Sequence, residues 1–105
     1  MSKVYNYLGL ARRAGKIVSG EGAAESGVRR GQVLLLLIAE DASANTYRKF
    51  SSLAQNHNVS FLVYGEKDHF GQAIGQSPRA VLGVTDRNFA NVIREQVKGS
   101  VQEKN

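Results

Sequence analysis

Seven consecutive apolar residues, Val33 to Ala39, constrain the fold of this chain more than any other feature. A strand with one face in solvent alternates apolar and polar residues, whereas a strand covered on both faces is apolar throughout. The run therefore predicts a central strand between two helical layers, with Leu35 and Leu37 on one face and Leu34 and Leu36 on the other. It is far shorter than the ~20 residues of a membrane-spanning helix.

Helical and extended patterns alternate along the rest of the chain. The expected helices are a first one capped by Ser2 and stopped near Gly15, then Gly20 to Arg30, Ala44 to about Gln55 after a Ser43 cap, Lys67 to Ile74, and Asp86 or Arg87 to Val97. The other expected strands are Ile17 to Val18, Phe61 to Tyr64 and Ala80 to Thr85. Short connections without a linker predict an α/β fold: one three-layer α/β/α sandwich over residues 1–98 with about four strands in a mixed sheet, followed by a frayed polar tail at 99–105.

Basic residues outnumber acidic ones, with fourteen Lys and Arg against nine Asp and Glu and a formal net charge of +5. In a domain of 105 residues this excess favours a nucleic acid as the partner over an acidic protein or a membrane surface. The absence of cysteine excludes disulfides, thiolate zinc sites and thiol nucleophiles. Since the segment after Met1 does not have the pattern of a signal peptide, we expect a soluble, cytoplasmic protein.

Residues suited to catalysis are few and isolated. His57 lies in a polar turn and His69 in a short helix, without a second His or a Cys beside either. Glu40 and Asp41 follow the central strand, where α/β enzymes often hold carboxylates, but Asp41 also suits the turn before the next helix. A glycine-rich segment lacks the third glycine of the dinucleotide fingerprint because Glu25 stands there. We therefore expect no enzymatic activity, no cofactor and no metal site.

A basic loop and a glycine-opened helix start lie close together in the sequence. Gly20 and Gly22 lack the side chains that would keep a phosphate or an extruded base away from the N–H groups of the second helix. Arg12, Arg13 and Lys16 would add positive charge from the neighbouring loop. Each feature also has a structural explanation, since glycines suit a tight strand-to-helix turn and an arginine pair complements the dipole at a helix end. The residues alone leave both roles open.

Several short motifs occur in the order and spacing of one known family. They are Leu8-Gly9-Leu10-Ala11-Arg12-Arg13-Ala14-Gly15-Lys16, Ser19-Gly20-Glu21, Arg30-Gly31, Ile38-Ala39-Glu40-Asp41, Ala42-Ser43-Ala44-Asn45-Thr46, and a late segment with Lys67, Phe70-Gly71 and Ala73-Ile74-Gly75. Over about Leu8 to Ala90 the chain resembles the kink-turn-binding ribosomal proteins of the L7Ae and L30e superfamily, in particular its small bacterial members of YlxQ type. The resemblance implies an α/β/α sandwich and RNA binding in a ribosomal or ribonucleoprotein setting.

The chain departs from this family at the start of the second helix. Kink-turn binders carry Gly-x-Asn-Glu-x-x-Lys there, whereas the matching residues here are Gly20, Gly22, Ala23 and Ser26. Because three polar groups are missing, we expect weak kink-turn binding dominated by phosphate contacts.

A second departure lies after the third strand, where the family offers an apolar loop to a flipped-out base. This chain has Tyr64-Gly65-Glu66 instead, of which the tyrosine can stack on a base whereas Glu66 would repel phosphate.

We expect a non-enzymatic RNA-binding protein of the translation apparatus, with ribosomal or other structured RNA and ribosomal proteins as partners. Two alternatives stay open: a protein-interaction adaptor that kept the fold but lost specific RNA binding, and a small enzyme or nucleotide-binding domain. Clustering of basic residues around Gly20 would favour RNA binding over the adaptor, and a deep pocket near Glu40 and Asp41 would favour an enzyme. The expected RNA-binding residues are Lys16, Ser19, Gly20, Glu21, Gly22, Ala23, Ser26, Glu40, Asp41, Tyr64, Gly65, Lys67 and Arg79.

Overall fold

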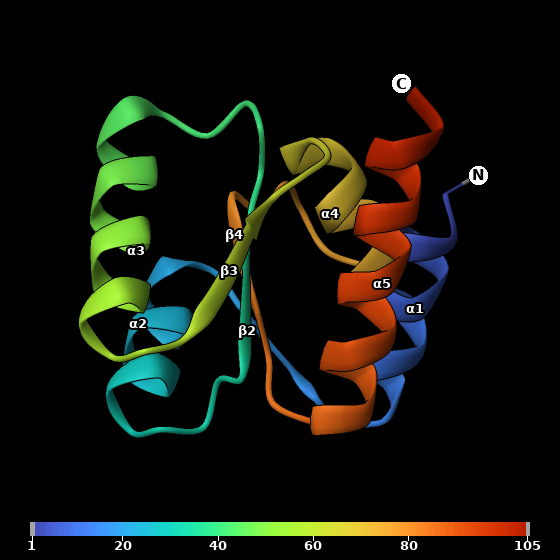
Figure 1. Ribbon diagram of the computed structural model, residues 1–105. Coiled ribbons are helices and arrows are strands. Elements are labelled where there is room, and N and C mark those ends of the chain that lie inside the picture. The colour runs from blue at the N-terminus through green and yellow to red at the C-terminus, as the bar shows by residue number, and fades with distance from the viewer. Residues whose placement is uncertain (1, 105) are drawn as a thin grey trace.

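Four strands form one mixed sheet in the order β1-β4-β2-β3 (Figure 1), in a computed structural model that describes residues 2–104 and the side chains of residues 2–99. The strands are β1 (Ile17–Ser19), β2 (Leu35–Ile38), β3 (Ser60–Val63) and β4 (Val81–Val84). β2 pairs in parallel with β3 and antiparallel with β4, which also pairs antiparallel with β1. The apolar run therefore contributes a central strand, as its composition predicts.

Helices cover both faces of the sheet and make the three predicted layers (Figure 1). One face carries α2 (Glu21–Arg29) and α3 (Ala44–Asn56), and the other carries α1 (Lys3–Arg13), α4 (Lys67–Ile74) and α5 (Arg87–Lys104). α5 continues past the predicted end at Val97, because the following residues include no proline and only Gly99 as a weak helix former. The predicted fraying of residues 99–105 falls largely outside the described side chains and stays a prediction.

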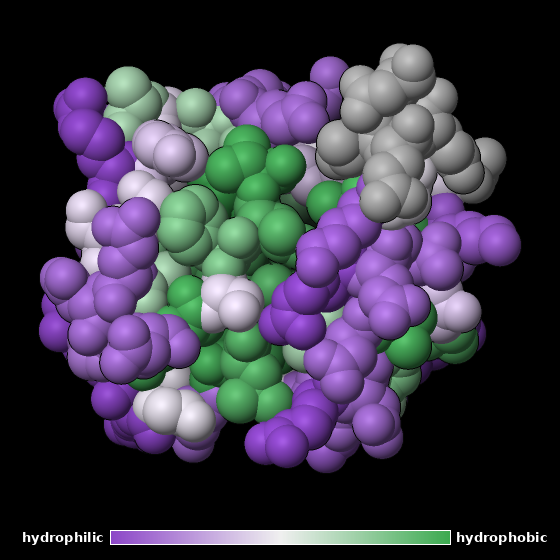
Figure 2. Space-filling model, viewed as in Figure 1, coloured by the Kyte–Doolittle hydropathy of each residue, from purple (hydrophilic) through white to green (hydrophobic). Residues whose placement is uncertain are grey.

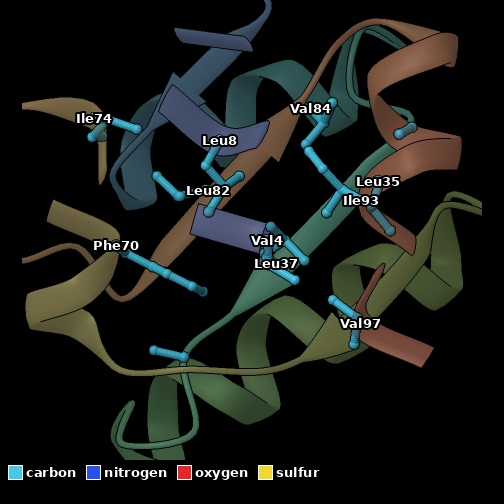
Figure 3. Packing of buried hydrophobic residues seen from close by; sticks show 12 residues of the cluster. Val4, Leu8, Leu35, Leu37, Phe70, Ile74, Leu82, Val84, Ile93 and Val97 are labelled. Atoms are coloured by element: carbon cyan, nitrogen blue, oxygen red, sulfur yellow. The ribbon is translucent and has the colours of Figure 1, made fainter. Parts of the chain in front are cut away.

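Two apolar clusters fill the spaces between the sheet and the helical layers. Leu35 and Leu37 lie in the cluster under α1, α4 and α5 (Figure 3), whereas Leu36 and Ile38 lie in the cluster under α2 and α3. The prediction was wrong for Leu34, whose side chain is 36% exposed. The strand begins only at the next residue, so Leu34 lies at the end of the sheet, beyond the helices that cover β2.

A glycine inside α2 has a packing role that compensates for its low helix propensity. A Cβ atom on Gly27 would lie 2.7 Å from Cγ2 of Val33. The missing side chain therefore lets α2 pack closely against the chain that enters β2, which offsets the ~1 kcal/mol that glycine costs in a helix.

The edge strand β3 leaves apolar side chains in contact with solvent. Figure 2 shows a hydrophobic stripe between two hydrophilic flanks, where β3 runs in Figure 1. Val63 on this strand is 42% exposed, and Tyr47 on α3 is 43% exposed although the helical pattern predicts it on the buried face. Within the part of the chain that the structure describes, no helix has the length and apolar character needed to cross a membrane.

Candidate nucleic-acid interface

The sheet topology brings the starts of three helices to one edge. β1 and β2 both run antiparallel to β4, and β3 runs parallel to β2, so β1, β2 and β3 end on the same side of the sheet. α2, α3 and α4 follow these strands, and the loop at residues 75–80 returns to β4 at the same place. Because the N–H groups of a helix start carry partial positive charge, this surface, called here the three-helix edge, is suited to an anion.

A hollow of about 450 Å³ lies in the three-helix edge. It joins residues from three helix starts and from the loop before β4, although these segments are distant in sequence. Its lining residues are Gly20, Glu21, Ser43, Thr46, Lys67, Pro78, Arg79 and Ala80. The structure thus brings together four of the residues that the sequence predicts for RNA binding: Gly20, Glu21, Lys67 and Arg79.

The helix starts at this edge are held in three different ways. Gly20 precedes α2 with φ of 89°, which favours glycine, and provides no side-chain cap for the first N–H groups of that helix. Ser43 caps α3, as predicted, by accepting a hydrogen bond from the Thr46 N–H at 3.1 Å. Asp41 does not cap α3 but accepts from the N–H of Lys67 at 2.9 Å, so it joins the loop after β2 to the start of α4.

The guanidinium of Arg79 is fixed by the loop that carries it. Nη1 donates to Oγ of Ser77 at 2.7 Å, and Nη2 donates to Oε1 of Gln76 at 2.7 Å. The same Gln76 oxygen accepts from the hydroxyl of Ser19 at 3.3 Å. Among the described residues, neither Arg79 nor Lys67 has a carboxylate within 4.0 Å. Nη1 of Arg79 also donates to the carbonyls of Ser77 and Pro78, so the guanidinium is preorganised, while no carboxylate of the described residues neutralises its charge.

Gln76 and Ser77 were missed by the sequence analysis. The lone proline at position 78 marks the turn, but only the antiparallel return of β4 shows that this turn lies beside Gly20.

Exposed carboxylates surround these two cations. Glu21 accepts a hydrogen bond from the Thr46 hydroxyl at 3.1 Å and so links α2 to α3. The exposed acidic residues at the helix starts and the loops before them are Glu21, Glu40, Asp41, Glu66 and Asp68. Within the described residues, no three His, Asp or Glu side chains are grouped as metal ligands would be. The edge can therefore contact an anion mainly through Lys67, Arg79 and the backbone of α2.

Tyr64 and Gly65 lie against α1 instead of in the hollow. The Tyr64 hydroxyl is 2.8 Å from Oγ of Ser2, and its ring centroid is 5.9 Å from that of Tyr5. Gly65 lies under the Tyr5 hydroxyl, where a Cβ atom would overlap the phenol oxygen. Burial raises the pKa of the Tyr5 phenol. The carbonyl of Gly65 accepts from the N–H of Glu40 at 2.8 Å.

The basic residues of the first loop do not gather around Gly20. Lys16 precedes β1 and Gly20 follows it, so at about 3.3 Å per residue they are ~13 Å apart, at opposite ends of that strand. Arg12 and Arg13, at the end of α1, lie with Lys16. The prediction of one continuous basic edge was therefore wrong, because β1 separates the two groups.

Gly22, Ala23 and Ser26, the positions that depart from the kink-turn pattern, are exposed on α2. Gly22 and Ser26 line a separate hollow of about 350 Å³ beside Arg29 and Arg30.

Comparison with known proteins identifies similar sequences and structures. Residues 2–94 match a family described as the ribosomal protein L7Ae/L30e/S12e/Gadd45 family. An RNA-binding protein YlxQ of Bacillus subtilis is 39% identical over 80% of this chain and 84% of its own length, and one of Enterococcus faecium is 33% identical over 92% and 93%.

Two solved structures are also similar. A Bacillus halodurans protein described as having unknown function has a TM-score of 0.90 and 31% identity, and covers 93% of this chain and 99% of its own. A Giardia lamblia 15.5kD RNA binding protein has a TM-score of 0.74 and 25% identity, and covers 94% and 84%.

Proposed function

The chain belongs to the ribosomal protein L7Ae/L30e/S12e/Gadd45 family, and we propose that it is a non-enzymatic RNA-binding protein that holds RNA at the three-helix edge. The observation that carries the proposal is the hollow in which Lys67 and Arg79 meet the uncapped start of α2. The names of the similar proteins from Bacillus subtilis, Enterococcus faecium and Giardia lamblia support RNA as the ligand.

Each part of the hollow has a separate role in this proposal. The N–H groups at the start of α2 donate to a phosphate, which can approach closely because Gly20 has no side chain. Arg79, held by Gln76 and Ser77, presents its planar guanidinium to a second phosphate or to a base edge. Lys67 adds a mobile charge beside them. The exposed carboxylates of the edge repel RNA that does not fit, so binding depends on the shape of the RNA.

The RNA is proposed to be ribosomal or another structured RNA of the translation apparatus in the cytoplasm, with ribosomal proteins as neighbours. A kink-turn is proposed to bind weakly, because Gly22, Ala23 and Ser26 stand where kink-turn binders carry Asn, Glu and Lys. Tyr64 and Gly65 would shape the loop before α4 from the side of α1, and Asp41 would fix its start.

The test compares RNA affinity before and after removal of the two cations. Fluorescence anisotropy of a structured ribosomal RNA fragment is measured at several salt concentrations for the natural chain, Lys67→Gln and Arg79→Lys. We expect Lys67→Gln to reduce the slope of log K against log salt by about one. Arg79→Lys should lower the affinity while keeping the charge, because lysine cannot reproduce the planar donor geometry.

Lys98→Gln is the matched control, since it removes one exposed charge from α5, away from the hollow. Equal effects of Lys67→Gln and Lys98→Gln would contradict the assignment of the edge. Absence of any RNA binding at low salt would contradict the function itself and would favour the adaptor.

A further inference from the structure

The positive charge of the protein gathers at the end of the sheet opposite the three-helix edge. There α1 and α2 end and α5 begins, at the bottom of Figure 1. The exposed basic residues of this surface, called here the basic end, are Arg12, Arg13, Lys16, Arg29, Arg30 and Arg87. The carboxylates near these cations are those of Asp86, which accepts from the N–H of Phe89 at the start of α5, and of Glu25, which pairs with Arg29. The surface therefore has a large uncompensated positive charge.

Backbone pairing shows that the segments of the basic end lie next to one another. The N–H of Thr85 donates to the carbonyl of Lys16 at 2.9 Å, and the N–H of Leu34 donates to the carbonyl of Val84 at 2.8 Å. Lys16 therefore lies level with Leu34 across the end of β4. The end of α1 carries Arg12 and Arg13 next to Lys16 in the chain, and the end of α2 carries Arg30 shortly before Leu34.

A hollow of about 540 Å³ lies at this end of the sheet, where Gly15 precedes Lys16 and Gly31 follows Arg30. It is lined by Gly15, Val18, Gly31, Gln32, Leu34 and Thr85. A Cβ atom on Gly15 or Gly31 would have no neighbour within 4 Å, so the backbone is open to a ligand on both sides. The exposed side chain of Leu34 supplies an apolar floor. Open glycine backbone and an exposed apolar side chain therefore occur together, next in sequence to Lys16 and Arg30.

Complementarity to helix dipoles does not account for this surface. A cation at a helix end is stabilised by the dipole, which would explain arginines at the ends of α1 and α2. Lys16 lies outside any helix, however, and Arg87 is the first residue of α5, where the dipole disfavours a cation. Among the described residues, Arg29 is the only one of these six cations that forms an ion pair, with the Glu25 carboxylate at 3.1 Å.

We propose that the basic end is a second RNA-binding surface, which takes a single-stranded segment with phosphates on the cations and a base over Leu34. Proteins that bind single strands combine a positive groove with surfaces against which bases pack, and a single strand carries a ring beside every phosphate, whereas an acidic side chain carries none. Five of the six cations are arginines, which bind phosphate with paired donors and stack on bases. With RNA also at the three-helix edge, the protein would bridge two RNA segments.

The test uses a short oligouridine and removes the same number of charges from two places. The variant Arg12→Gln, Lys16→Gln, Arg30→Gln neutralises three exposed cations of the basic end, and the control Lys3→Gln, Arg94→Gln, Lys98→Gln neutralises three on α1 and α5. We expect the first to flatten the slope of log K against log salt by about two, at about 0.7 per phosphate contact with a single strand, and the control to leave the slope unchanged. Leu34→Glu, which places a carboxylate in the hollow, should remove oligouridine from the basic end without loss of fold, because Leu34 is already 36% exposed.

Native mass spectrometry with oligouridine and the structured ribosomal RNA fragment, both in excess, counts the RNA molecules of each kind on each protein. We expect two bound RNA molecules on the natural chain and one on the basic-end variant. Loss of one RNA from Lys67→Gln, Arg79→Gln but not from the basic-end variant would overturn this inference and leave the proposed function standing. Loss of one RNA from the basic-end variant but not from Lys67→Gln, Arg79→Gln would overturn the proposed function at the three-helix edge and support this inference. Competition by polyglutamate as strong as that by oligouridine would also overturn it, because the surface would then bind acidic chains in general.

Discussion

Replacement of Gly71 by alanine tests whether α4 positions the loop that carries Arg79. Gly71 is buried in α4, and a Cβ atom there would lie 2.7 Å from the carbonyl oxygen of Gln76 and closer still to that of Ser77. Ordinary contact begins at 3.4 Å, so the loop or the helix must move by at least 0.7 Å. The neighbouring atoms belong to the backbone, which cannot rotate away as a side chain could.

The two energetic contributions of Gly71→Ala have opposite signs. Overpacking of this kind costs about 1–3 kcal/mol, whereas alanine in place of glycine gains up to about 1 kcal/mol of helix propensity. We expect a net loss of about 1–2 kcal/mol in the free energy of unfolding. The displaced loop should also weaken RNA binding at the three-helix edge, since Gln76 and Ser77 hold the Arg79 guanidinium.

Urea unfolding of Gly71→Ala and Gly22→Ala measures the effect against a matched control. Gly22 also lies in a helix, but a Cβ atom there would have no neighbour within 4 Å. We expect Gly22→Ala to stabilise the protein by about 0.5–1 kcal/mol. Equal stabilisation by both substitutions would refute the reasoning, because the close approach of α4 to the loop would then cost nothing.

Three further predictions concern recognition, pH and packing. The triple variant Gly22→Asn, Ala23→Glu, Ser26→Lys should bind a kink-turn more tightly, by about 1–3 kcal/mol for each base contact. In titrations this gain should disappear when the G·A pairs of the kink-turn are changed to Watson–Crick pairs. Tight binding by the natural chain that depends on the G·A pairs would show that these three positions have not lost recognition. Hydrogen bonds from Lys49, then from Arg29, lower the pKa of Glu25, so its stabilising effect is present at neutral pH and lost as the pH falls through that lowered pKa. Glu25→Gln should therefore lower the melting temperature at pH 7 but not in acid below that lowered pKa, and an equal difference under both conditions would contradict this. Leu37→Ala should lower the free energy of unfolding, measured in urea, by about 2–5 kcal/mol, since the side chain is fully buried. A loss under about 1 kcal/mol would mean that the core closes around the gap.

Local patterns were sufficient to predict most of the elements. Ser2 and Ser43 cap their helices as expected, and Gly75 ends α4 in the left-handed conformation. These features depend on residues within a few positions of one another, so the sequence specifies them directly. The exposure of Leu34 and Tyr47 was not predicted, because it depends on where the neighbouring layer ends.

The candidate interface was less predictable, because strand order decides which loops meet. Lys16 and Gly20 are four positions apart in the sequence, yet β1 places them at opposite ends of the sheet. Arg79 and Gly20 are distant in sequence, yet the antiparallel return of β4 brings them to one hollow. No periodicity of a single segment contains this information.

The two ends of the sheet should contribute differently to RNA binding because their charges differ. At the three-helix edge, carboxylates such as Glu21 and Asp68 lie in the first turns of helices, where the dipole stabilises them, so an incoming phosphate meets both attraction and repulsion. Binding there should depend on the fit of a folded RNA, since a phosphate gains from Arg79 and from the N–H groups of α2 only where it keeps clear of the Glu21 carboxylate. At the basic end six cations outnumber the carboxylates of Asp86 and Glu25, so its contribution should be nearly independent of sequence and strongly dependent on salt. Substitutions at the three-helix edge should therefore change the ratio of affinities for structured and unstructured RNA, while substitutions at the basic end should change both affinities by the same factor. Measurement of both affinities for Lys67→Gln and Arg30→Gln separates these effects, and a change in the ratio from Arg30→Gln alone would contradict this division.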